Sequence, residues 1–163
     1  MEINLNTTLS KSLLSGLAGA VALNILHETV RQFVPEAPRA DILGMRSIKK
    51  GFRAANAQPP TGNTLYGLAM LGDVTSNALY YSVIGLNPKQ PLLTGAALGA
   101  LAGVGAVTLP GPMGLGEAPT TRTPATVAMT FGWYLFGGLV AGLVYDRLKS
   151  RPYRTMASSQ RQA

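Results

Sequence analysis

The stretch that decides the fold is residues 92–109, LLTGAALGALAGVGAVTL. It carries no charged side chain, and a glycine recurs at every fourth position through most of its length. A helix with this spacing has one nearly bare face, so another helix can approach it closely, which in a bilayer is a main source of helix association. We therefore predict that this stretch is the central helix of a small membrane bundle. The glycines expected to pack helix against helix, here and in a later apolar stretch, are Gly95, Gly99, Gly103, Gly138 and Gly142.

The composition of the whole chain also favours a membrane protein. Of its 163 residues, 47% are hydrophobic and only 13% are charged, and the charged share is about half that of a typical soluble protein. The chain has 19 Gly and 11 Pro, and both residue types are more frequent in membrane helices than in soluble ones. It has no Cys, which excludes disulfides, thiolate metal sites and cysteine nucleophiles.

Three further apolar stretches complete the predicted bundle. They cover residues 12–34, 65–86 and 124–145, and each is close to the roughly 20 residues that a membrane span requires. The sequence thus predicts an all-α, polytopic membrane protein with four transmembrane helices. These form a single domain over residues 1–150, and a polar tail covers residues 151–163.

Residues 41–55, between the first two spans, predict a short amphipathic helix. At about 100° per residue, Ile42, Ile48 and Phe52 fall on one side and the basic residues on another. Such a helix beside two spans is typical of one that lies in the membrane interface; a solvated helix resting on the ends of the bundle is the alternative. The side chains expected to contact anionic lipid head groups are Arg46, Lys49, Lys50 and Arg53.

The net charge of +7 does not indicate nucleic acid as a partner. The basic residues lie in one connection and in the C-terminal tail, next to apolar runs, which is typical of contact with anionic lipid. Four spans place both termini on one side of the membrane. Basic residues are equally divided between the two sides, but several follow the last span directly. On that basis we expect the termini to be cytoplasmic, and we expect the membrane to be a bacterial inner membrane.

Polar and ionisable side chains gather in one half of the predicted bundle. The first span ends on the side where the second begins, so an antiparallel hairpin brings the end of the first span near Asp73. Ionisable groups inside a membrane are costly and by default indicate a functional site. A structural role is the alternative, because Glu28 and Arg31 are three residues apart and can pair. The candidate cluster is Asn24, His27, Glu28, Arg31, Asp73 and Asn77.

The sequence predicts no catalytic residues, no metal site and no cofactor. His27 is the only histidine, which excludes the two-histidine zinc motif and a bis-histidine haem within one subunit. The chain lacks a phosphate-binding Gly-Lys-Ser/Thr loop and a nucleophile elbow. Residues 27–41, HETVRQFVPEAPRAD, are dense in charge and proline and look like a motif, but the pattern indicates no activity.

Three functions are compatible with these observations. The first is a non-enzymatic accessory or structural subunit of a larger membrane complex, whose partners are other membrane subunits or further copies of this chain. The second is a homo-oligomeric channel or small transporter whose pathway is lined by His27, Glu28 and Asp73. The third is a membrane-embedded, lipid-modifying enzyme with His27 as base.

Overall fold

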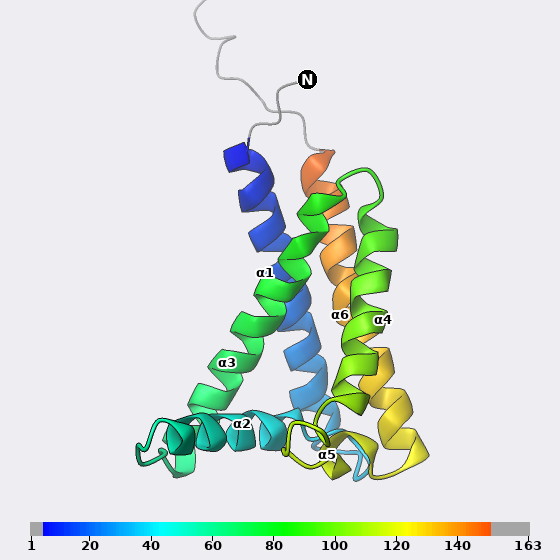
Figure 1. The fold of residues 1–163 in the computed structure, drawn as a ribbon. Coiled ribbons are helices and arrows are strands. Elements are labelled where there is room, and N and C mark those ends of the chain that lie inside the picture. Colours follow the sequence, from blue (N-terminus) through cyan, green and yellow to red (C-terminus); the bar gives the residue numbers. More distant parts are fainter. Residues whose placement is uncertain (1–4, 151–163) are drawn as a thin grey trace, which may run out of the picture.

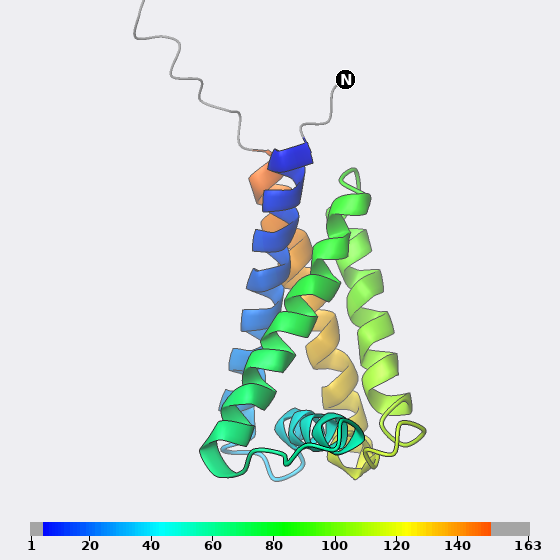
Figure 2. The same ribbon diagram turned by 60° about the vertical axis from the view of Figure 1, so that its left-hand side comes forward.

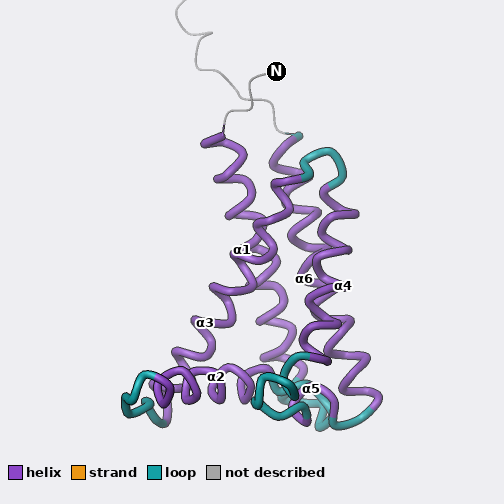
Figure 3. Tube along the Cα trace, in the orientation of Figure 1, coloured by secondary structure: helices purple, strands orange, loops and turns teal. Residues whose placement is uncertain are grey.

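The computed structural model describes residues 5–150, and all regular structure within this range is helical (Figure 3). The polar tail predicted for residues 151–163 lies outside it. The elements are α1 (Leu5–Val30), α2 (Ala40–Ala54), α3 (Gly62–Ser82), the short 3-10 helix η1 (Val83–Leu86), α4 (Pro91–Thr108), α5 (Ala118–Thr121) and α6 (Pro124–Lys149).

Four long helices run along the molecule, and α2 lies across one end of them (Figure 1). The start of α1 and the end of α6 are together at the other end. α6 packs along both α4 and α1, and α3 packs along α1, whereas α3 and α4 share few contacts. α3 and α4 diverge toward the end where α2 lies, with α2 beneath them (Figure 2). The helix with the most extensive packing is therefore α6, and α4, predicted as the central helix, packs mainly on α6 at the edge of the bundle.

The glycine face of α4 packs on α6 of the same chain. A Cβ atom added at Gly95 would lie 2.2 Å from the carbonyl oxygen of Gly138, and one at Gly99 would lie 2.7 Å from Cα of Leu135. A Cβ atom at Gly142 would lie 2.7 Å from the carbonyl oxygen of Pro91. The two backbones are thus in direct contact, which only a residue without a side chain permits.

α1 uses glycine in the same way on two of its faces. A Cβ atom at Gly16 would lie 2.1 Å from the carbonyl oxygen of Ala78 in α3. One at Gly19 would lie 2.5 Å from the carbonyl oxygen of Gly137 in α6. α1 therefore joins α3 to the α4–α6 pair through backbone contacts.

Larger side chains fill the space between α1, α3 and α6. The core includes Leu23, Tyr81, Trp133 and Tyr145, all of them buried. The hydroxyl of Tyr81 donates a hydrogen bond of 2.8 Å to the carbonyl oxygen of Tyr134. This bond satisfies a polar group that would otherwise be buried without a partner.

Within residues 5–150, three helices are long and apolar enough to cross a membrane: Thr8–Val30 within α1, then α4 and α6. Their outer faces carry large apolar side chains such as Ile25 and Leu93, which are 61% and 65% exposed. α3 has 21 residues but is less apolar, because it contains Asp73 and Asn77. The fourth span and the interfacial position of α2 stay predictions.

The helix bounds differ from the predicted ranges mainly at α1, which covers Leu5–Val30 instead of 12–34. The helix begins at Leu5 because the polar residues before position 12 can also adopt helical conformation, although they lie outside the apolar run. The helix ends before Pro35 through a run of turns, in which the amide of Val34 bonds to the carbonyl of Val30 at 3.0 Å.

We expect Gly138→Ala to destabilise the bundle by about 1–3 kcal/mol, because overpacking a tight contact costs this much. Gly132→Ala on the same helix is the matched control, since no atom lies within 4 Å of its added Cβ; it should be neutral or slightly stabilising. Thermal unfolding of the purified protein in detergent, followed by circular dichroism, measures both. Equal melting temperatures for the two variants would contradict the close α4–α6 contact.

Candidate functional site

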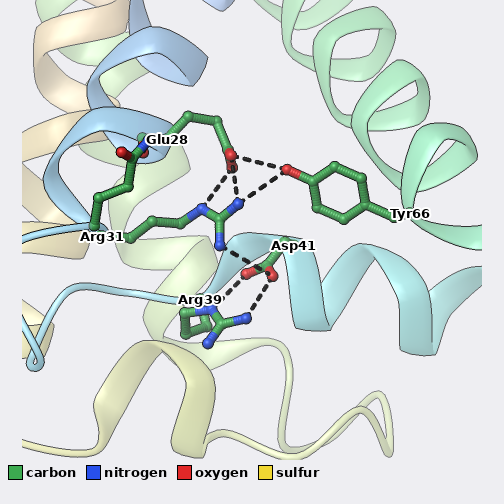
Figure 4. Close-up of polar contacts among 6 residues, drawn as sticks. Glu28, Arg31, Arg39, Asp41 and Tyr66 are labelled. Carbon is green, nitrogen blue, oxygen red and sulfur yellow. Dashed lines mark hydrogen bonds and ion pairs between the residues drawn. The ribbon is translucent and has the colours of Figure 1, made fainter. Parts of the chain in front are cut away.

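A network of polar side chains joins α1 to α3 at the end where α2 lies (Figure 4). Arg31, just after α1, donates from Nε to Oε1 of Glu28 at 2.9 Å and from Nη2 to the hydroxyl of Tyr66 at 3.0 Å. The hydroxyl of Tyr66, on α3, donates to Oε2 of Glu28 at 2.8 Å. Each of the three groups thus has two partners within the network, which fixes the end of α1 against the start of α3.

Asp41, in the first turn of α2, extends this network. Arg39 donates to both of its carboxylate oxygens, at 2.9 and 2.7 Å, and Nη1 of Arg31 lies 3.9 Å from Oδ2. Burial opposes ionisation of Asp41, but the hydrogen bonds and charge of Arg39 and the charge of Arg31 hold its pKa below the ordinary value of 3.8. Asp41 is therefore ionised at neutral pH and ties α2 to the end of α1.

A second polar group surrounds Asp73 on α3. Nδ2 of Asn24, on α1, donates to Oδ2 of Asp73 at 2.8 Å, and Nδ2 of Asn77 donates to Oδ1 at 3.1 Å. Both donors are neutral amides, and none of the ion pairs among the described residues includes Asp73. This carboxyl group therefore lies between helices without a compensating positive charge.

His27 belongs to neither group. Its side chain is buried against α6, with ring centroids 4.7 Å from Trp133 and 6.1 Å from Tyr134. Its Nε2 atom is buried without a hydrogen-bond partner. The predicted cluster is thus divided in three: Glu28 with Arg31, Asp73 with its two asparagines, and His27 apart from both.

Two cavities adjoin the second polar group. One, of about 350 Å³, lies between α2 and α3 and has Asp73 in its wall; we call it the α2–α3 cavity. The other, of about 630 Å³, lies between α3 and α4 and is mostly apolar; we call it the α3–α4 cleft. Ser76 and Tyr134 line both, so the two spaces are neighbours, and His27 lines neither.

The basic residues predicted to contact lipid line a further cavity, of about 420 Å³. Its walls are α2 on one side and residues 114–116, in the connection between α4 and α5, on the other. The predicted helix-packing glycines lie elsewhere, between α4 and α6.

No protein-family model, curated protein or solved structure matches this chain. Its class is therefore defined by the structure: the described part of the chain is all-helical, and three of its helices are long and apolar enough to cross a membrane. Within residues 5–150 no group of three or more His, Cys, Asp or Glu side chains is arranged to hold a metal ion.

Two parts of the site are not among the residues predicted from the sequence. Tyr66 could be found from its place in the first turns of α3, which the α1–α3 hairpin puts opposite Glu28. The Pro- and Gly-rich composition of the connection near Gly114 and Gly116 indicates a tightly turning segment. In the structure both glycines have positive φ, of 67° and 75°. The contact of this segment with α2, however, depends on tertiary packing.

We expect Asp41→Asn to destabilise the fold by about 2 kcal/mol, because hydrogen bonds to charged groups contribute roughly this much. Since folding lowers the pKa of Asp41, the wild-type protein keeps this contribution above the ordinary pKa of 3.8 and loses it as the pH falls further. The thermal midpoint in detergent, measured from about pH 7 to pH 3, checks this. The difference between the two proteins should shrink in acid, and a constant difference would contradict the role of Asp41. Asp146→Asn at the other end is the control.

Proposed function

We propose that this protein is an integral membrane protein in which α1, α3, α4 and α6 cross the bilayer and α2 lies in the interface. The 21 residues of α3 span about 32 Å, which matches a hydrocarbon core of about 30 Å. Its outward positions include Leu71 and Leu79, which are 64% and 57% exposed. We also propose a bacterial inner membrane with cytoplasmic termini; the orientation is supported by Arg147 and Lys149 at the end of α6, since basic residues gather on the cytoplasmic side.

We further propose that it works without catalysis, as an accessory subunit that receives a transmembrane helix of another membrane protein in the α3–α4 cleft. The observation that carries this proposal is the lining of the cleft. α4 contributes Ala102, Gly105 and Ala106, and α3 contributes Ser76 and Asn77. Small residues that admit a close backbone, together with side chains that hydrogen-bond across helices, are typical of contacts between membrane helices.

The neighbouring glycine stripe of α4 shows what such residues do when a helix covers them. There Gly95 and Gly99 contact the backbone of α6 directly. In the cleft, apart from the helix's own backbone, a Cβ atom added at Gly105 would approach Cδ1 of Leu109, one turn further along the chain, at 3.4 Å. α4 thus has a glycine stripe that is packed within the chain and, beside it, small residues that line the open cleft.

We expect a photoreactive amino acid at Ala106 to cross-link, in native membranes, to a second membrane protein. The matched control is the same amino acid at Ala97, which is exposed on α4 and does not line the cleft. Mass spectrometry of the product distinguishes another protein from a second copy of this 17.0 kDa chain. Reciprocal isolation through the cross-linked protein should recover the wild type but not Ala106→Leu, which fills the cleft. Cross-links to lipid alone, or equally at both positions, would contradict the proposal.

A second candidate function is passage of protons or cations at Asp73. The observation that favours it is a carboxyl group in the wall of the α2–α3 cavity, held only by neutral amides. Ionisable residues that line a cavity within a membrane mark ion or proton pathways. His27 does not line this cavity, so no observation supports its role in a pathway or as the base of a lipid-modifying enzyme.

If Asp73 forms such a pathway, Asp73→Asn should reduce proton or K⁺ flux into proteoliposomes at least tenfold, because the neutral amide removes the charge that Asp73 contributes to the cavity wall. Asp146→Asn, whose carboxylate pairs with Lys149 at 3.0 Å at the far end of α6, should leave the flux unchanged. A pH-sensitive dye or K⁺ electrode measures the rate. Flux that is absent in the wild type, or equal in all three proteins, would exclude this function.

A further inference from the structure

The connection between α4 and α5 folds back onto the basic face of α2. Nη1 of Arg46 donates to the carbonyl oxygen of Leu115 at 2.6 Å, and Nζ of Lys50 donates to that of Met113 at 2.5 Å. A Cβ atom added at Gly116 would lie 2.8 Å from Nη1 of Arg46. Gly116 also has a φ of 75°, a conformation that favours glycine, so the turn that brings the backbone to the cations requires this residue.

The cavity between them gathers positive charge without a balancing anion. Arg46, Lys49, Lys50 and Arg53 all line its 420 Å³. The ion pairs among the described residues use other basic side chains, so no carboxylate pairs with any of these four. Glu117, the acidic residue next to the cavity, is exposed and does not pair with them.

The four cations differ in what they already bind. Arg46 and Lys50 hold the α4–α5 connection in place through its carbonyl oxygens. Lys49 and Arg53 have no hydrogen-bond or ion-pair partner within residues 5–150. Like charges held close together repel one another, and an anion bound between them relieves this repulsion. Lys49 and Arg53 are the groups free to contact such an anion directly.

We propose that this cavity binds a phosphate group, carried either by the head group of an anionic phospholipid or by a soluble phosphate compound. Arginine presents a planar fork that matches phosphate oxygens, and lysine binds phosphate as a point charge. The lipid source follows if α2 lies in the interface, as proposed above. The site is separate from the α3–α4 cleft, so its test does not depend on a partner helix.

The experiment titrates the purified full-length chain, in a neutral detergent, with phosphatidylglycerol, phosphatidylcholine or inorganic phosphate, and counts bound ligands by native mass spectrometry. The test variant is Lys49→Gln/Arg53→Gln, which leaves the carbonyl contacts of Arg46 and Lys50 intact. The control is Lys89→Gln/Arg147→Gln, which removes two exposed cations at the other end of the bundle. Melting temperatures verify that both double variants are folded, and the two single variants provide a second measurement if one is not.

We expect one phosphatidylglycerol to bind the wild type in preference to phosphatidylcholine. The test variant should weaken this binding roughly thirtyfold, since each basic side chain near an anionic lipid contributes a factor of about five; the control should not. Saturable binding of inorganic phosphate that competes with no lipid and is lost in the test variant would instead identify a soluble phosphate ligand. The proposal would be overturned if both double variants lost phosphatidylglycerol binding equally. It would also be overturned if the wild type bound phosphatidylglycerol no better than phosphatidylcholine and did not bind inorganic phosphate.

Discussion

The direct backbone contact between α4 and α6 is the constraint on which the rest of the bundle depends. Gly and Ala side chains give α4 little bulk, so its association with α6 depends on close packing of the two backbones over several turns. α6 in turn receives Gly19 of α1 through its own Gly137. Both contacts require glycine on at least one side, and they leave α3 attached to the bundle mainly through α1.

This arrangement explains why the polar groups lie where they do. Because α3 is held along α1 and not along α4, its second face is open toward the α3–α4 cleft. Asp73 and Asn77 then meet each other and Asn24 of α1, while Ser76 lies in the cleft wall. Polar side chains would be costly on a lipid-facing helix surface. Of the three on α3, Asn77 is buried and Asp73 is half-buried, whereas Ser76 is exposed in the wall of the cleft.

Local sequence patterns predict much of this structure, and the rest depends on how the helices pack against one another. Uncharged runs and glycine spacing predict α1, α4 and α6, because both reflect single-helix properties. Spacing also predicts the Glu28–Arg31 pair, and the hairpin predicts the approach of Asn24 to Asp73. The spacing of glycines does not show which neighbouring helix a glycine face contacts. For this reason the sequence predicts α4 as the central helix, whereas the structure has α6 there. His27 follows the buried positions Ala20 and Leu23 by seven and four residues, and this periodicity places it on the α6 face of α1.

The α4–α5 connection joins the two regions to which we assign binding. Pro110 and Met113 line the α3–α4 cleft, and residues 114–116 line the basic cavity. Lys50 bonds to the carbonyl of Met113, between the two. Lys50 is therefore the cation whose contact with Met113 ties the wall of the α3–α4 cleft to α2. Lys49 and Arg53 make no such contact among the described residues, so they line the basic cavity without holding the connection in place.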